Sequence, residues 1–80
     1  MSSPLPDQAA LGRAVQAIRD ECGLSQVQLA AASGLAQAWI SQIENGKRNP
    51  SWSNVLRLAE GLGIRLSELV KRAERLAEAP

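Results

Sequence analysis

The chain has 80 residues, which is enough for one small domain and too few for two. Apolar residues make up 45% of it and aromatic residues only 2%, which favours a compact helical core over a β-sandwich or a disordered chain. The net charge of +1 indicates no class of charged partner, so any nucleic-acid role must rest on local geometry.

Histidine is absent, and Cys22 is the single cysteine, which excludes an internal disulfide and a multi-cysteine zinc site. We therefore expect no metal and no cofactor. No apolar run approaches the roughly 20 residues of a membrane span, and the N-terminus lacks the apolar segment of a signal peptide. These features predict a cytoplasmic protein without a membrane partner.

The N-terminal residues contain prolines and no periodic apolar pattern, so we predict a flexible arm over residues 1–7 and a single domain over residues 8–80. Asp7 can cap the first helix, and Gly23 ends it. The apolar stripe of this helix consists of residues at helical spacing: Leu11, Val15, Ile18 and Cys22.

Two short helices follow. Ser25 and Gln28 form a capping-box pattern that starts the second helix, and Gly34 ends it after about two turns. The third helix should begin at residues 36–37 and end at the Asn-Gly pair 45–46, which suits a left-handed turn.

The Pro-Ser pair at residues 50–51 predicts the start of a fourth helix, which ends at Gly61 or Gly63. Its expected buried face consists of Val55, Leu56, Leu58, Ala59 and Leu62. Ser67 can cap a fifth helix that reaches about residue 79. The predicted fold class is therefore all-α: a compact domain of helices, without strands or repeats.

The third helix has two different sides. At about 100° per residue, a helical wheel places Trp39, Ile40 and Ile43 together on an apolar side. The opposite side consists of Gln37, Ala38, Ser41 and Gln42. That side suits water or a partner. Two short helices joined by a tight turn also have the geometry of a helix-turn-helix, in which the second helix lies in the major groove of DNA.

The segment LSQVQLAAASGLAQAWISQIENGKRNPS resembles the helix-turn-helix of the Xre/Cro family of phage and bacterial repressors. The similarity covers residues 8 to about 70. It implies a five-helix, lambda-repressor-like domain that acts as a homodimer on a pseudopalindromic operator in double-stranded DNA. It therefore predicts a DNA-binding transcriptional regulator, specifically a repressor.

Base readout is expected from the polar side of the third helix. Gln37 can form a bidentate pair with adenine, and Ala38 can offer its methyl group to thymine. Ser41 and Gln42 lie a turn further along and can reach other base edges. The alternative for each of these residues is simple solvation.

Phosphate contacts are expected beside that helix. The resemblance assigns a phosphate-contacting and bracing role to Gln26, whose alternative is an ordinary helix-starting residue. The loop after the third helix supplies the other candidates, Asn45, Lys47, Arg48 and Asn49. The alternative is a polar loop. Gln28 is explained by the capping box alone.

Two further groups have structural roles. The resemblance predicts an ion pair between Arg19 and Glu44, which ties the first helix to the end of the third. In the fifth helix an apolar stripe continues beyond Leu66 and Leu69, which we expect to complete the core. The remaining members of the stripe are predicted to form a dimer interface: Val70, Ala73 and Leu76.

The chain departs from the family in two places. Ala36 stands where a capping Ser or Thr is common, so the third helix lacks a side-chain cap. The N-terminal arm contains no lysine or arginine, so we assign it no contact with DNA.

Other functions have weaker support in the sequence. The main alternative is a protein-interaction module that works through the fifth helix, with a partner protein as its ligand. An antitoxin or a restriction-modification controller would be a subtype of the regulator. We do not expect an enzyme, because the sequence has no histidine, no paired cysteines and no glycine-rich phosphate-binding loop, and its acidic residues do not cluster with a plausible nucleophile.

Overall fold

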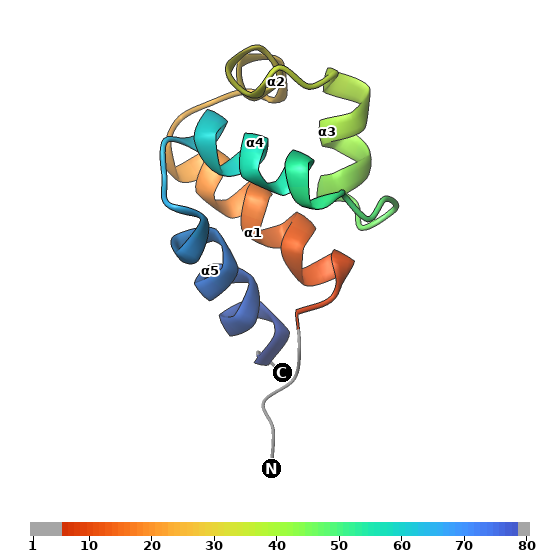
Figure 1. Cartoon of the computed structure of the whole chain (residues 1–80), viewed down its shortest axis with the longest axis vertical. Helices are drawn as coiled ribbons and strands as arrows, with labels where there is room; N and C mark the ends of the chain where they lie inside the picture. Colours follow the sequence, from red (N-terminus) through yellow and green to blue (C-terminus); the bar gives the residue numbers. More distant parts are fainter. Residues whose placement is uncertain (1–5, 79–80) are drawn as a thin grey trace.

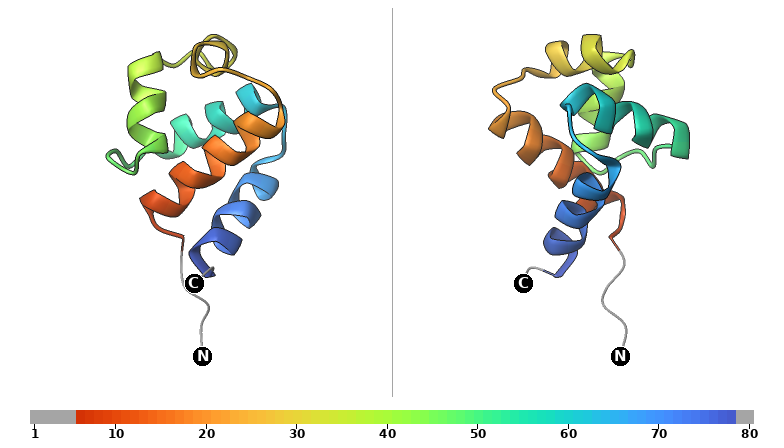
Figure 2. Two further views of the ribbon diagram at one scale, coloured as in Figure 1. Left: turned by 180° about the vertical axis from the view of Figure 1, so that it is seen from behind. Right: turned by 60° about the vertical axis from the view of Figure 1, so that its left-hand side comes forward.

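The computed structural model describes residues 6–78, which contain five helices and no strand. The helices are α1 (Gln8–Glu21), α2 (Gln26–Ser33), α3 (Gln37–Glu44), α4 (Trp52–Leu62) and α5 (Leu66–Glu78). Most of the predicted N-terminal arm lies outside the described residues. Helices α1 and α5 lie side by side, α2 packs on α4, and α3 lies at one edge of the domain (Figures 1 and 2).

Local capping accounts for most helix starts. The Asp7 carboxylate accepts a hydrogen bond from the Ala10 backbone N–H at 2.8 Å, as expected for the start of α1. At α2 both bonds of the predicted capping box are present, Gln28 N–H to Ser25 Oγ at 3.0 Å and Ser25 N–H to Gln28 Oε1 at 2.8 Å. Ser51 caps α4 through the Asn54 N–H at 3.3 Å. The all-α prediction is confirmed.

The predicted cap of α5 is wrong. Helix α5 begins at Leu66, so Ser67 already lies within its first turn. The first helical carbonyl is that of Arg65, which accepts from the Glu68 and Leu69 N–H groups at 3.0 and 3.3 Å. Because the chain leaves α4 through the left-handed Gly63, it is in position to start the helix before Ser67.

The buried face of α4 differs from its prediction at one residue. Leu58, Ala59 and Leu62 are buried, and Val55 is half-buried against the core. Leu56, however, is 42% exposed, so its prediction as a buried residue is wrong. Leu56 lies one turn after the exposed Trp52, on the outer side of α4.

One core fills the space between the helices. Its buried members come from all of them: Ala14, Val15, Ile18, Leu29, Ile40, Ile43, Leu58, Ala59, Leu62, Leu69 and Ala73. The contribution of Ile40 and Ile43 fixes α3 from its inner side, so its outer side is free of core packing. None of the described helices is long and apolar enough to cross a lipid bilayer.

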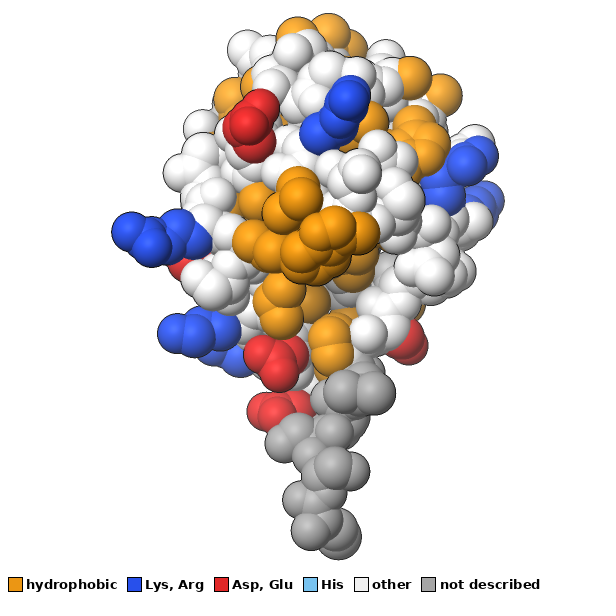
Figure 3. All heavy atoms as spheres, viewed as in Figure 1, with side chains coloured by type: hydrophobic (Ala, Val, Ile, Leu, Met, Phe, Trp, Pro, Cys, Tyr) orange, Lys and Arg blue, Asp and Glu red, His pale blue; other side chains and the backbone are white. Residues whose placement is uncertain are grey.

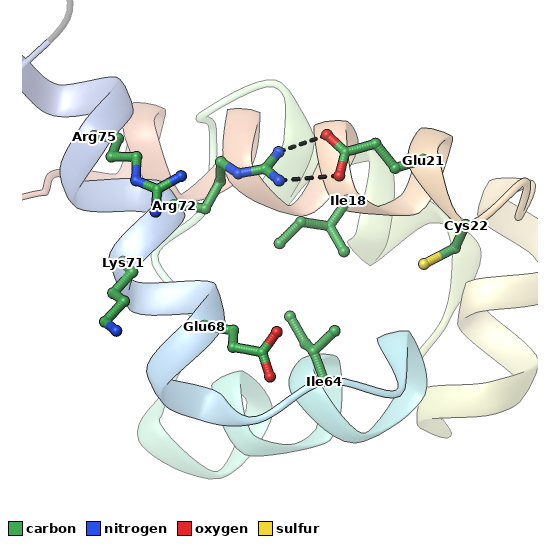
Figure 4. Close-up of a pocket in the computed structure, with 8 residues that line it drawn as sticks. All are labelled: Ile18, Glu21, Cys22, Ile64, Glu68, Lys71, Arg72 and Arg75. Carbon is green, nitrogen blue, oxygen red and sulfur yellow. Dashed lines mark hydrogen bonds and ion pairs between the residues drawn. The ribbon is translucent and has the colours of Figure 1, made fainter.

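An ion pair joins α5 to the end of α1. Arg72 donates from both terminal nitrogens to the carboxylate of Glu21, at 2.6 and 2.9 Å (Figure 4). This bidentate hydrogen bonding lowers the pKa of Glu21 and raises the pKa of Arg72. The pair borders a hollow of about 400 Å³ whose apolar lining comes from Ile18 and Ile64, with Cys22 at one end.

Candidate nucleic-acid interface

The outer side of α3 carries the polar side chains predicted to read bases. Gln37, Ala38 and Gln42 are exposed there, and Ser41 is half-exposed. On the inner side Ile40 and Ile43 are fully buried, and Trp39 packs against the core. The structure therefore presents the predicted base-reading residues together on one surface of one helix.

Helix α3 starts without a side-chain cap. Its N-cap residue, Ala36, makes no side-chain hydrogen bond, as the sequence predicts, and its carbonyl accepts from the Trp39 and Ile40 N–H groups at 3.1 and 3.0 Å. Gly34 turns the chain between α2 and α3 with a φ of 74°. Such a left-handed residue reverses the chain within a few residues, which brings α3 against α2.

A buried ion pair fixes the end of α3 to α1. Arg19 Nε donates to Glu44 Oε2 at 2.7 Å, and Arg19 Nη2 donates to Oε1 of the same carboxylate at 3.0 Å. The exposed fractions are 9% for Arg19 and 6% for Glu44, so water screens this pair poorly. The hydrogen bonds that Arg19 donates to the Glu44 carboxylate raise the pKa of Arg19, whose guanidinium stays charged.

The same carboxylate also orients a residue of α2. Gln26, at the first position of α2, donates from Nε2 to Glu44 Oε1 at 3.0 Å. Arg19 Nη1 in turn donates to the Leu24 carbonyl at 2.8 Å, just before α2 begins. One carboxylate thus joins α1, α2 and α3, and it positions the glutamine predicted to contact phosphate.

The loop after α3 bends back to the base-reading surface. Arg48 Nε donates to Gln42 Oε1 at 2.7 Å, and Asn45 Nδ2 lies 3.5 Å from Ser41 Oγ. The predicted phosphate-contacting residues of this loop are all exposed: Asn45, Lys47, Arg48 and Asn49. Two of the predicted base readers are therefore in contact with predicted phosphate binders, a relationship that sequence spacing alone did not reveal.

The residues predicted to form the dimer interface differ in burial, and the interface itself stays a prediction. Ala73 is only 2% exposed and belongs to the core, so it offers almost no surface in the single chain. The reason is the way α5 lies on α1, which turns Ala73 inward. Leu76 is half-buried against the core, and Val70 remains exposed.

Sequence reasoning missed the largest exposed apolar side chains next to Val70. Trp52 is 66% exposed and Leu56 is exposed beside it on α4. Trp52, Val55 and Val70 line one shallow depression. Figure 3 shows a cluster of hydrophobic side chains on this face, in the region where α4 and α5 meet in Figure 1. We call Trp52, Leu56 and Val70 the apolar patch. The signal in the sequence was the tryptophan between two serines at the start of α4.

The comparison with protein families agrees with this architecture. A family model described as a helix-turn-helix domain matches residues 10–73, which span α2 and α3 and most of the remaining fold. The chain belongs to this helix-turn-helix family.

Curated relatives are named as regulators. The chain is 40% identical over 60 residues to the immunity repressor protein of Bacillus phage phi105, covering 75% of this chain and 42% of that protein. It is 44% identical over 57 residues to the control protein C.MunI of a Mycoplasma species, covering 71% of this chain and 77% of that protein. The chain thus spans less than half of the phage repressor and most of the control protein.

A solved structure shows the same fold. The restriction-modification controller protein C.AhdI from Aeromonas hydrophila superposes with a TM-score of 0.75 at 39% identity, covering 78% of this chain and 94% of that one. The clp gene regulator ClgR from C. glutamicum superposes with a TM-score of 0.78 at 26% identity, covering 82% and 86% of the two chains.

Proposed function

We propose that this protein is a sequence-specific, double-stranded-DNA-binding transcriptional regulator that acts as a repressor in the cytoplasm. The observation that carries the proposal is the outer side of α3, whose exposed polar residues are held outward by the buried Ile40 and Ile43. An α-helix of this kind fits the major groove of B-DNA. The family and the regulators named among the relatives support it.

Gln37 is proposed to read adenine at the N-terminal end of α3, where a recognition helix approaches the bases. Its amide can donate to N7 and accept from the N6 amino group of adenine. Ala38, Ser41 and Gln42 follow on the same surface and are proposed to contact neighbouring bases. A protein that acts in this way binds its target and needs no catalytic group.

Phosphate contacts are proposed on both sides of this surface. Gln26 keeps a second amide hydrogen free of its bond to Glu44, and this hydrogen can donate to a phosphate oxygen. Beyond α3, the exposed Asn45, Lys47, Arg48 and Asn49 can contact the sugar-phosphate backbone. The uncapped N-terminus of α3 offers further N–H donors.

The test is selection of bound duplexes from a randomised DNA pool, with a Gln37→Ala, Gln42→Ala double variant in parallel. We expect the wild type to enrich an inverted-repeat motif. In the variant, the preference for the selected base over the others should fall by about 5- to 150-fold at each position that a glutamine contacts well. Both side chains are exposed, so the variant should melt at the wild-type temperature. Failure of the wild type to enrich any motif at low salt would contradict the proposal.

We also propose that the protein acts as a homodimer through the apolar patch. Two-fold dimers are the commonest protein oligomers, and an exposed cluster of large apolar side chains marks an interface. A dimer would place two α3 helices on half-sites about 34 Å apart. Its second copy would cover Trp52, which otherwise stays in water at the surface of α4.

Trp52→Glu is expected to break this dimer. A buried charge at an interface hot spot costs about 2 kcal/mol or more, which raises the dimer dissociation constant at least about 30-fold. Sedimentation equilibrium at micromolar concentrations measures the change. The matched control is Val27→Glu, which places the same charge on an apolar position of α2 that is 58% exposed, against 66% for Trp52. A Trp52 variant that still dimerises like the wild type would exclude this interface.

A restriction-modification controller is the subtype with a specific observation in its favour. C.MunI is named a control protein, and C.AhdI is named a restriction-modification controller protein. The match to this chain covers 77% of C.MunI and 94% of C.AhdI. If the apolar patch instead binds an unrelated partner protein, the chain is the interaction module considered above, and pool selection would enrich no motif.

A further inference from the structure

One hydrogen bond determines what Gln42 can offer to DNA. Arg48 Nε lies 2.7 Å from Gln42 Oε1, although the two residues belong to different segments, the loop after α3 and α3 itself. Both side chains are exposed, so this bond forms on the surface proposed to face the major groove. We propose that Arg48 is a positioning residue that makes Gln42 a reader of guanine rather than adenine. This inference rests on the proposed DNA-binding function.

The identity of the bonded atom follows from chemistry. A guanidinium nitrogen only donates, so the atom of Gln42 that faces Arg48 must be the carbonyl oxygen. A bond from a charged donor is shorter and about twice as strong as a neutral one. The amide oxygen is therefore directed to the loop, and the amide nitrogen, on the other branch of the planar group, is directed away from it.

The major-groove edges of adenine and guanine differ in how well they match this fixed amide. Adenine presents one acceptor, N7, beside one donor, the N6 amino group, so a glutamine must use both its oxygen and its nitrogen to pair with it. Guanine presents two neighbouring acceptors, N7 and O6. With Oε1 of Gln42 engaged by Arg48, the amide offers N–H donors, which match the guanine edge and meet the adenine N6 amino group donor to donor.

Gln37 provides the contrast within the same helix. It lies on the same exposed surface, but within residues 6–78 its side chain makes no hydrogen bond that would fix the amide. It can therefore turn either edge toward DNA and pair with adenine, as proposed above. Two glutamines of one recognition helix thus acquire different base preferences, because only Gln42 has an arginine partner.

The experiment compares two variants that each remove one cation from the same loop. Arg48→Ala removes the hydrogen-bond partner of the Gln42 side chain. Lys47→Ala removes a neighbouring charge, and the bond that Lys47 makes to Gln42 joins backbone atoms, which the substitution keeps. Pool selection with the wild type gives the motif, and the position whose preference disappears in Gln42→Ala is the base pair that Gln42 contacts. Affinities are then measured for duplexes with guanine or adenine at that position, at one salt concentration, because phosphate contacts are salt-dependent.

For the wild type we expect guanine to be preferred over adenine about fivefold or more. In Arg48→Ala this ratio should fall below about twofold, because the released amide can turn its oxygen to the adenine amino group. Lys47→Ala should weaken binding to both duplexes equally and leave the ratio unchanged. A second variant, Gln42→Glu, keeps an oxygen partner for Arg48 but presents only acceptors, so it should prefer cytosine at this position, which offers the N4 donor.

The outcomes separate this inference from the function on which it rests. A wild type that enriches no motif would overturn both. A wild type that prefers adenine at the Gln42 position, or an Arg48→Ala variant that lowers affinity as uniformly as Lys47→Ala, would overturn the positioning role and leave the DNA-binding function intact. In the latter case Arg48 would contact phosphate only.

Discussion

Gly12→Ala should destabilise this protein severely, although the substitution adds a single methyl group and favours helix formation. Gly12 lies in α1 where that helix crosses the end of α3. A Cβ at this position would overlap the Ile43 carbonyl oxygen and lie 3.0 Å from the Glu44 carbonyl oxygen. Both obstacles are backbone atoms, which cannot move away as the end of a flexible side chain can.

The expected loss is about 3 kcal/mol or more, at the upper end of what overpacking costs. A domain of this size has a total stability of roughly 4–12 kcal/mol, and each kcal/mol lowers its melting temperature by about 4–8 °C. Thermal unfolding followed by circular dichroism should therefore show a midpoint at least about 12 °C below that of the wild type.

Gly23→Ala is the matched control, because it makes the same substitution just beyond the C-terminal end of α1. A Cβ on Gly23 meets no atom within 4 Å, but the residue has a φ of 71°. The left-handed conformation costs an alanine about 1–2 kcal/mol, so this variant should lose less than Gly12→Ala. If the two variants melted at the same temperature, the close approach of α1 and α3 would not be the cause of the loss.

The position of Gly12 also shows what the sequence did not reveal. Helix starts and ends were predictable at α1, α2 and α3 because their signals are local: Asp7, the Ser25 and Gln28 pair, and Gly34 each act on backbone groups a few residues away. The crossing of two helices depends on residues far apart in the chain. Nothing near Gly12 in the sequence indicates that the end of α3 touches it.

Burial on α5 and α4 was uncertain for the same reason. Val70, Ala73 and Leu76 belong to one apolar stripe of α5. Helical periodicity predicts the stripe, but it does not determine which of its residues pack against α1. The structure places Ala73 in the core and Val70 at the surface, and it adds Trp52 and Leu56 of α4 to the exposed set. The proposed dimer surface therefore lies across two helices, whereas the sequence suggested one.

The proposed base-reading surface was more accessible to sequence reasoning, because it is defined within a single short helix. The residues of α3 that face away from Ile40 and Ile43 follow from helical spacing alone. The contacts that orient them do not. Gln26 bonds Glu44 from α2, and Arg48 bonds Gln42 from the loop after α3. Long polar side chains such as these have several possible partners in the sequence, and only the fold determines which partner lies within reach.

Glu44→Ala is expected to reduce both stability and DNA affinity. The variant removes the buried carboxylate that pairs with the buried Arg19, which keeps only the exposed Asp20 carboxylate at 3.3 Å. Gln26 also loses the acceptor of its Nε2 group. Removing one partner of a buried ion pair costs about 3–5 kcal/mol. Chemical denaturation should show this loss as a lower midpoint with an unchanged slope. Affinity for the selected operator should also fall, although Glu44 itself is too buried to touch a base.

A double variant separates the two effects. Arg19→Met with Glu44→Leu replaces the ion pair by apolar side chains of similar size, which often restores stability because no buried charge remains unpaired. We expect it to recover most of the loss, but not all, because the Leu24 carbonyl also loses its donor. DNA affinity should stay low in this stable variant, since Gln26 has no carboxylate to hold it. If affinity returned together with stability, Glu44 would serve the fold alone, and the orientation of Gln26 would not depend on it.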